Sequence, residues 1–129
     1  MARSDRRAGR DGGRRLGRAA EALVLAYFRR RGARPLARSW RSGRREIDLV
    51  LDEGGTVVFV EVKARRHPGA WPAVESLRAP QRARLVEAAG AFLGSRGLGG
   101  RPCRFDVVTV TWHAPAAQPE IEHLPNAFE

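Results

Sequence analysis

The segment 45–63 constrains the fold of this chain most strongly, because it has the pattern of two β-strands joined by a tight turn. It reads REIDLVLDEGGTVVFVEVK, with β-branched and apolar residues on both sides of Asp52-Glu53-Gly54-Gly55. A glycine pair between two such runs is typical of a β-hairpin whose turn has two residues. The segment therefore predicts an antiparallel pair of strands.

The turn also fixes which residues of the two strands face each other. If Gly54 and Gly55 form the turn, Glu53 pairs with Thr56, and pairing continues outward in the same register. Directly opposed residues point to the same face of a sheet, with Cβ atoms about 4.5–5.5 Å apart. The predicted register sets Asp48 opposite Glu61, and Glu46 opposite Lys63.

Side chains alternate between the two faces of a strand. One face of the hairpin is therefore expected to be apolar and to pack on a helix, whereas the other face carries the charged residues. The apolar face consists of Ile47, Leu49, Leu51, Val58, Val60 and Val62, and the charged face of Glu46, Asp48, Val50, Phe59, Glu61 and Lys63.

Asp48 and Glu61 would repel each other at this separation unless a proton or a cation lies between them. A divalent metal would satisfy both carboxylates. Mg²⁺ takes only one or two protein carboxylates and retains several waters, which leaves room for a phosphate oxygen. Lys63 would lie beside this site, where an ammonium group stabilises developing charge or helps to activate a water nucleophile.

Lys63 is the only lysine among the 24 basic residues of the chain. Lysine is a compact point charge whose pKa shifts readily, so arginine is not equivalent to it at a catalytic position. The alternative is a solvated strand face on which Glu46 and Lys63 form an ordinary cross-strand pair. The position of Asp48 and the lone lysine together favour the catalytic interpretation.

The positive charge is concentrated in the N-terminal third of the chain. The formal net charge is +10, and residues 1–45 hold fifteen arginines against three acids. Such a field attracts polyanions, with nucleic acid as the first candidate and an anionic membrane surface as the second. A solvated arginine-rich surface would also explain the excess, but not its concentration in one part of the chain.

No segment approaches the roughly 18 apolar residues that a membrane-spanning helix needs. The basic N-terminus is not followed by the apolar stretch of a secretory signal. Cys103 is the only cysteine, which excludes an internal disulfide and a thiolate metal cluster. We therefore expect a cytoplasmic protein without a membrane partner.

Residues 14–31 have the periodicity of an amphipathic helix, and Gly32 after three arginines is typical of a helix end. Glu21 lies at the margin of the apolar stripe and is a candidate third carboxylate beside the hairpin acids. Residues 1–13 are polar and basic, which predicts a disordered arm before a single domain at 14–129. The predicted stripe consists of Leu16, Ala20, Leu23, Val24 and Tyr27.

The rest of the chain adds strands at 33–40, 103–112 and 120–124, and a second amphipathic helix at 79–94. The order is therefore helix, strand, hairpin, helix, strand, strand. This order is typical of an α/β fold in which helices flank a mixed central β-sheet. The predicted apolar stripe of the second helix consists of Leu85, Val86, Ala89, Phe92 and Leu93.

Basic and amide side chains flank the hairpin and open the second helix. A basic turn at 41–45 comes directly before the acids, and two further arginines follow Lys63. The first turn of the second helix adds donors that can reach a phosphate if that end faces the hairpin. The predicted nucleic-acid-binding residues are Arg44, Arg45, Arg65, Arg66, Gln81 and Arg82.

Three short motifs resemble the core of the PD-(D/E)XK nuclease superfamily: Gly17-x-x-x-Glu21, Glu46-Ile47-Asp48 and Glu61-Val62-Lys63. Ile47 stands where the name of the superfamily has proline, but the acid that follows is in place. The wider match resembles the YraN family of bacterial endonuclease-like proteins. It comprises Gly17–Tyr27, Ala37–Trp40, the EIDLV and VFVEVK strands, Arg101–Val108 and Asn126-Ala127-Phe128.

This resemblance implies a restriction-endonuclease-like core related to archaeal Holliday-junction resolvases. By that analogy Asp48 and Glu61 bind Mg²⁺ or Mn²⁺ together with the Val62 carbonyl, and Lys63 assists the attacking water. Glu21 completes the acidic set, and Glu46 has an accessory role. Because junction resolvases act as dimers, the resemblance also favours a homodimer.

We therefore expect a metal-dependent endonuclease that hydrolyses phosphodiester bonds in DNA, with branched DNA as a candidate substrate. The alternative is a nucleic-acid-binding module on a nuclease fold that has no turnover of its own. A descendant that only binds would be free to lose Lys63 or Asp48. The intact set of acids and lysine thus favours the enzyme.

Overall fold

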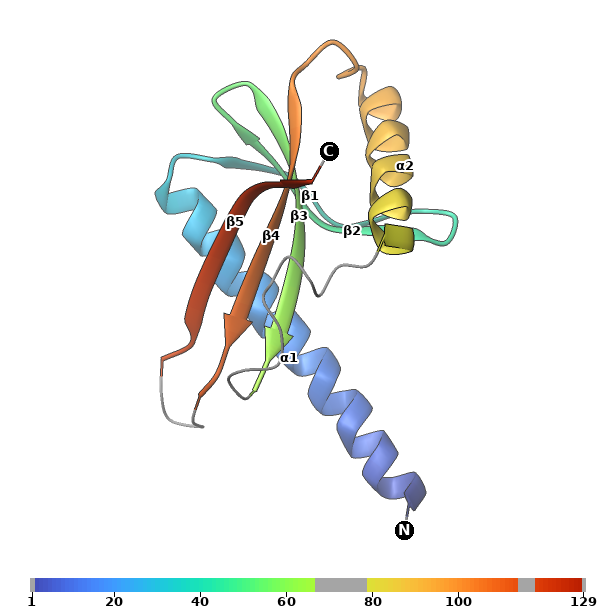
Figure 1. The fold of residues 1–129 in the computed structure, drawn as a ribbon, viewed down its shortest axis with the longest axis vertical. Helices are drawn as coiled ribbons and strands as arrows, with labels where there is room; N and C mark the ends of the chain where they lie inside the picture. The colour runs from blue at the N-terminus through green and yellow to red at the C-terminus, as the bar shows by residue number, and fades with distance from the viewer. Residues whose placement is uncertain (1, 67–78, 114–117, 129) are drawn as a thin grey trace.

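The computed structural model describes residues 2–66, 79–113 and 118–128. Over these residues the chain forms five strands and two helices (Figure 1). The predicted order of helix, strand, hairpin, helix, strand, strand is confirmed. The elements are α1 (Ala2–Arg30), β1 (Arg34–Ser42), β2 (Arg45–Glu53), β3 (Thr56–Arg65), α2 (Ala79–Arg96), β4 (Cys103–Thr111) and β5 (Glu120–Phe128).

The strands form one mixed sheet in the order β1-β2-β3-β4-β5. β3 and β4 are parallel, whereas the other neighbouring pairs are antiparallel. Parallel neighbours need a crossover connection, which contains α2. The predicted α/β fold with a mixed central sheet is thus confirmed.

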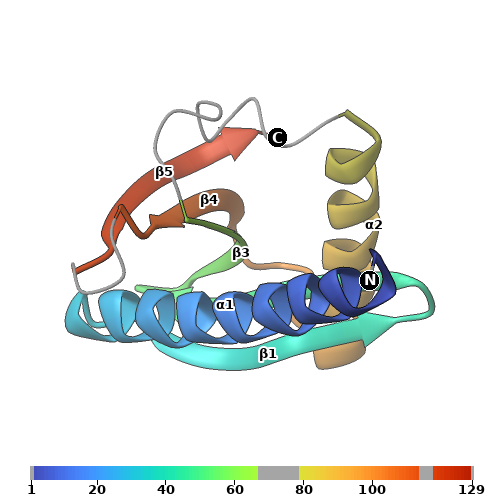
Figure 2. The same ribbon diagram turned by 90° about the horizontal axis from the view of Figure 1, so that it is seen from below.

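The two helices cover opposite faces of the sheet, as Figures 1 and 2 show. On one face Val24 and Phe28 of α1 pack with Val58 and Val60 of β3. On the other face α2 packs against residues that alternate with these along the strands. This second cluster includes Leu85, Ala88, Ala89 and Phe92 of α2 with Val50, Val57, Phe59, Phe105 and Val107 of the sheet.

The hairpin turn confirms the register predicted near Gly54 and Gly55. Both glycines have positive φ angles, 61° and 94°, which the two-residue turn requires and which glycine adopts without strain. Pairing runs from Glu53 with Thr56 outward to Leu49 with Val60. The backbone N–H of Gly55 also donates to the Asp52 carboxylate at 2.9 Å.

Helix α1 begins at Ala2, so the backbone of residues 2–13 is helical where the sequence predicts a disordered arm. Adding residues to an existing helix is favourable once it has nucleated, and arginine and alanine are good helix formers. The division of the chain into arm and domain stays a prediction. At the other end, Gly32 has a φ of 89° and the Ala33 N–H donates to the Phe28 carbonyl, which is the predicted glycine-capped ending.

The buried stripe of α2 differs from the prediction at one position. Leu85, Ala89 and Phe92 are buried, but Val86 is 41 % exposed and Ala88 is buried in its place. Residues 85, 88, 89 and 92 recur at intervals of three and four, so they share the face that contacts the sheet. Neither α1 nor α2 is long and apolar enough to cross a membrane.

Strand β5 extends to Phe128, four residues beyond the predicted end. Its pairing with β4 is irregular between Phe105 and Val107, and Asn126 has a left-handed φ of 50°. The Asn126 N–H donates to the Asp106 carboxylate at 3.0 Å. The Phe128 ring stacks on Phe105, with 4.9 Å between ring centroids. A bulge at this irregularity thus lets β5 continue to Phe128, which pairs with Phe105.

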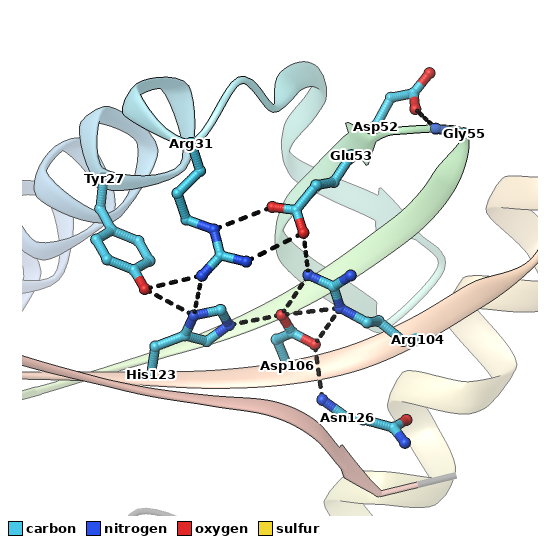
Figure 3. A network of polar contacts seen from close by, with 9 residues as sticks. All are labelled: Tyr27, Arg31, Asp52, Glu53, Gly55, Arg104, Asp106, His123 and Asn126. Carbon is cyan, nitrogen blue, oxygen red and sulfur yellow. Dashed lines mark hydrogen bonds and ion pairs between the residues drawn. The ribbon is translucent and has the colours of Figure 1, made fainter.

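Asp106 is the centre of a polar network that joins α1, the hairpin, β4 and β5 (Figure 3). Its side chain is 0 % exposed and accepts hydrogen bonds from Arg104 at 3.0 Å and His123 at 2.7 Å. The other ring nitrogen of His123 lies 2.9 Å from the Tyr27 hydroxyl. Arg104 also contacts Glu53, at 2.8 Å. The network fixes the C-terminal strand to the rest of the fold.

Candidate active site

The regular pairing of β2 with β3 stops at Leu49 and Val60, one residue before Asp48 would face Glu61. Instead, the Asp48 carboxylate accepts a hydrogen bond from the Val62 N–H at 2.9 Å. A side chain therefore replaces the backbone carbonyl that would continue the ladder. This opening separates the two strands where the predicted catalytic acids lie.

Strand β1 is distorted at the same level. Ser39 has a φ of 45°, and it lies between Arg38, which pairs with Leu49, and Trp40, which pairs with Ile47. Ser39 is therefore level with Asp48. A left-handed conformation is strained for serine, and such strain occurs at functional sites.

The distortion changes the face on which side chains of β2 point. Leu49 and Leu51 belong to the core cluster beneath α1, whereas Ile47 belongs to the cluster beneath α2. The prediction that all three share one face is therefore wrong. Strict alternation holds only for an unbroken strand, and β2 is kinked between Ile47 and Leu49.

The carboxyl groups of Asp48 and Glu61 are hydrogen-bonded to each other, and Glu61 is only 19 % exposed. Burial, followed by the charge of Asp48, raises the pKa of Glu61 to about 8. Burial also raises the pKa of Asp48, although the Val62 N–H opposes that shift. The pair therefore holds a proton at neutral pH unless a cation balances its charge.

Lys63 lies against this pair. Its Nζ lies 3.4 Å from Glu61 Oε1, and its side chain is 26 % exposed. The predicted pairing of Lys63 with Glu46 does not form, because the paired part of β2 and β3 ends before Glu46. Glu46 instead pairs with Arg41 of β1, and their side chains form an ion pair at 3.3 Å.

Glu21 reaches the site from α1, on the helix face that contacts the sheet. Burial raises the pKa of Glu21 first, and the negative charges of Asp48 and Glu46 raise it further. The predicted third carboxylate is thus within electrostatic range of the other acids. Arg38 of β1 opposes this shift, and it pairs with Leu49, which lies on the face of the sheet that α1 covers.

The donor set fits a hard divalent cation held by few protein groups. Asp48 and Glu61 offer carboxylate oxygens, and their mutual repulsion is relieved by positive charge between them. Over residues 2–66, 79–113 and 118–128, no group of three or more His, Cys, Asp or Glu side chains is arranged to hold a metal. Glu21 therefore lies near the pair without joining it as a third ligand, and waters would complete the coordination of Mg²⁺.

A cavity of about 130 Å³ opens beside Glu61 on the α2 side of the sheet. It brings together the turn before β2, the start of that strand, Glu61 of β3 and the first turns of α2. Three of the six predicted nucleic-acid-binding residues lie here, together with one arginine that was not among them, Arg84. The lining residues are Arg44, Arg45, Glu46, Glu61, Gln81, Arg84 and Leu85.

The other three predicted nucleic-acid-binding residues do not line this cavity. Arg65 ends β3, where its carbonyl accepts from the Trp112 N–H at 2.9 Å, and Arg66 follows it on the surface. The guanidinium carbon of Arg82 lies 5.8 Å from the centre of the Phe128 ring. The predicted basic surface is thus divided among the cavity, the end of β3 with Arg65 and Arg66, and the end of β5 beside Arg82.

Comparison with known proteins adds a family but no activity. Residues 20–110 match the family described as "Uncharacterised protein family UPF0102". A UPF0102 protein of Pseudomonas aeruginosa (strain LESB58) is 43 % identical over 127 residues, which cover 98 % of each chain. One from Stutzerimonas stutzeri is 44 % identical over 88 % of this chain and 93 % of its own length. One from Oleidesulfovibrio alaskensis is 46 % identical over 86 % of this chain and 55 % of its own.

Proposed function

We propose a function for this chain from its own site, because it belongs to the UPF0102 family, whose description states no activity. The chain is a metal-dependent endonuclease that hydrolyses phosphodiester bonds in DNA. The observation that carries this proposal is the partly buried pair of Asp48 and Glu61, with Lys63 against it and a basic cavity at its side.

Two partly buried carboxyls in contact, each with a pKa raised mainly by burial, are costly to a fold that makes no use of them. Asp48 and Glu61, with the Val62 carbonyl, would hold Mg²⁺ or Mn²⁺. Bound there, the ion would supply Lewis-acid stabilisation of the phosphate and a water of lowered pKa. The cost of burying the two acids is then offset by the cation.

Lys63 contributes a positive charge at a fixed place. Glu61 holds its ammonium group at 3.4 Å, and the side chain is largely buried. A fixed charge in a partly dry site stabilises a developing oxyanion more than a mobile charge in water does. In the proposed reaction Lys63 thus stabilises the pentacovalent phosphate and orients the attacking water, with Glu21 as an accessory acid.

The arginines supply the affinity for the backbone of the nucleic acid. Arg44, Arg45 and Gln81 lie at the cavity next to Glu61, so a strand bound there passes the acids. Arg65, Arg66 and Arg82 extend the proposed interface beyond it. The resemblance to junction resolvases leads us to propose branched DNA as substrate and a homodimer as the active form.

A nucleic-acid-binding module without turnover is the second candidate. It is favoured by the site having two carboxylates in contact rather than a group of three among the described residues. With a proton in place of a cation, this pair is chemically inert, while the arginines still bind phosphate. The two candidates therefore differ in whether the acid pair takes up a metal.

Cleavage of a DNA panel separates these candidates. We would incubate the purified protein with Mg²⁺ or Mn²⁺ and linear, flapped and four-way-junction DNA. The enzyme is expected to cut one of these substrates only with metal, and Glu61→Ala and Lys63→Ala to abolish the cutting. Glu122→Ala removes an exposed acid on β5 and serves as the matched control. Salt-sensitive binding without cutting in either metal would favour the binding module.

A further inference from the structure

We infer that the cavity beside Glu61 binds one phosphate group of the nucleic-acid backbone, and that Arg84 of α2 is its principal ligand together with Arg44. This inference rests on the proposed function only in taking nucleic acid as the ligand. It assigns a binding role to Arg84, to a helix that carries none of the catalytic acids, and to a defined volume next to them.

The size of the cavity suits a single phosphate. Its volume is about 130 Å³, which is small for a ligand pocket. A phosphate group with its ester oxygens occupies such a space. Pockets that enclose drug-sized ligands are about 300–1,000 Å³. The cavity is therefore of a size to take a phosphate group, while the attached sugar and base lie outside it.

The charged side chains that line the cavity differ in whether they already form ion pairs within the protein. Arg45 is engaged by Glu87 of α2 at 2.9 Å, and Glu46 is engaged by Arg41 at 3.3 Å. In the part of the chain that the structure describes, neither Arg44 nor Arg84 forms an ion pair or a hydrogen bond through its side chain. Two guanidinium groups thus face the cavity with their donors available to an anion.

The start of α2 adds to this positive potential. No acidic residue lies in the first turn of the helix, so its dipole is not neutralised there. Gln81 lies in that turn, and Arg84 follows one turn later on the same side as Leu85, which faces the core. The helix thus contributes two donors to the lining of the cavity, and the turn before β2 contributes Arg44.

Glu61 on the cavity wall places the proposed phosphate next to the catalytic pair. An anion placed beside two glutamates is repelled unless cations outnumber them. Three arginines line the cavity against Glu46 and Glu61. A phosphate bound to Arg84 therefore lies directly beside the catalytic pair, and it fixes the position of the strand relative to those acids.

Site-specific removal of phosphate charge tests this inference without any turnover. Binding of a fluorescein-labelled duplex and of a four-way junction would be measured in EDTA. Each DNA would carry one neutral methylphosphonate in place of one phosphate, at successive positions. One position is expected to weaken binding by the wild-type protein by about tenfold, the effect of one charge-assisted contact. Arg84→Ala is expected to bind unmodified DNA that much more weakly, and to be insensitive to the modification at that position.

Arg96→Ala is the matched control, since Arg96 lies on the same helix and its guanidinium contacts the Phe92 ring, 5.0 Å from the ring centre. It is expected to retain wild-type affinity and the wild-type methylphosphonate profile. Glu87→Gln is expected to strengthen binding several-fold, because it releases Arg45. Inorganic phosphate at millimolar concentration, added as a competitor, shows whether the cavity also takes the free ion.

Equal affinities of Arg84→Ala and Arg96→Ala would overturn the inference, and so would an unchanged methylphosphonate profile in Arg84→Ala. These readouts do not depend on cleavage. An Arg84-dependent position in a protein that cuts no DNA in any metal would support the cavity and contradict the proposed enzyme. Cleavage without such a position would support the enzyme and contradict the cavity.

Discussion

At the scale of single residues, the distinctive feature is a pair of carboxyl groups, Asp48 and Glu61, that lie in contact although their negative charges repel each other. Asp48 is fixed by the Val62 N–H, and Glu61 by Lys63. Each contact orients an oxygen, but neither removes the repulsion between the two groups. Without a cation the pair must hold a proton, so its charge state reports directly on what the site binds.

Replacing Glu61 by glutamine is expected to stabilise the metal-free protein at alkaline pH. The pKa of Glu61 is raised by folding from 4.5 to about 8, so the folded state binds more protons than the unfolded state in this interval. Wild-type stability therefore falls as pH rises from about 4.5 to 8, and that loss is complete above about pH 8. Glu61→Gln has no such loss and should be more stable there by about 1–3 kcal/mol.

Urea denaturation in EDTA at pH 5 and pH 9 measures this difference. Mg²⁺ should stabilise the wild-type protein at pH 9 and leave Glu61→Gln much less affected, because a ligand stabilises only the state that binds it. Parallel pH profiles for the two proteins would show that Glu61 ionises normally, and would contradict the account of the pair.

Lys63→Arg is expected to lower cleavage at least about 100-fold while DNA affinity stays within about twofold. Arginine keeps the charge, but its planar fork is larger than an ammonium group and cannot occupy the same place against Glu61. Cleavage and binding would be measured on the same DNA. An active Lys63→Arg variant would mean that any cation serves at this position, and that the lone lysine has no special role.

At the scale of elements, the site is produced by a kink shared by β1 and β2. Ser39 and Asp48 are level with each other, and the side chains of both strands change face at this level. Arg38 pairs with Leu49, which packs beneath α1, whereas Trp40 pairs with Ile47, which packs beneath α2. The register next to the hairpin turn could be predicted from the sequence, because two glycines determine it. The kink could not, since serine has no particular preference for a left-handed φ.

Substitutions at Ser39 should show this strain. Ser39→Gly is expected to preserve or slightly raise stability, since glycine adopts a φ of 45° without penalty. Ser39→Val should destabilise the protein by about 1–3 kcal/mol, because a β-branched residue resists this conformation. Denaturant midpoints measure both effects. A Val variant as stable as the wild type would show that the backbone relaxes here at no cost.

The network around Asp106 has the order hydroxyl, imidazole, carboxylate through Tyr27, His123 and Asp106, but its contacts are those of a structural clamp (Figure 3). Arg31 also lies 3.2 Å from the Tyr27 hydroxyl, and Asp106 is shielded from solvent. Among the described residues, no buried side-chain polar atom lacks a hydrogen-bond partner. A saturated, buried chain of this kind stabilises the packing of its four elements.

Asp106→Asn is expected to destabilise the protein by about 3 kcal/mol at neutral pH. Burial raises the pKa of Asp106, but the hydrogen bonds from His123, Arg104 and Asn126 outweigh it, so the pKa lies below its ordinary value of 3.8. The contribution of Asp106 is therefore complete above about pH 4 and is lost as pH falls through the lowered pKa.

Thermal melting at pH 7 and pH 3 checks this expectation. The difference between wild type and Asp106→Asn should be large at pH 7 and should shrink at pH 3. Glu120→Gln is the control, because Glu120 is also paired with a histidine, His113 at 3.0 Å, but is 69 % exposed. Equal effects of the two substitutions would show that burial of Asp106 contributes little.

At the scale of the whole molecule, the sheet separates two tasks. α1 covers one face and brings Glu21 to the acids, whereas α2 covers the other face and forms a wall of the basic cavity. Element order, the mixed sheet and the family could all be predicted from the sequence, since hydrophobic periodicity and short motifs carry them. The position of Arg84 could not, because it depends on how a helix is packed against a hairpin distant in sequence.

Binding of Mn²⁺ to the protein alone tests the central claim, that Asp48 and Glu61 together hold one divalent cation. Free Mn²⁺ would be followed by electron paramagnetic resonance during titration of the wild-type protein, Glu61→Ala and the surface control Glu122→Ala. The account predicts one site in the wild type and in Glu122→Ala, weakened at least about tenfold in Glu61→Ala. Equal Mn²⁺ binding by all three proteins, or none by any of them, would contradict it.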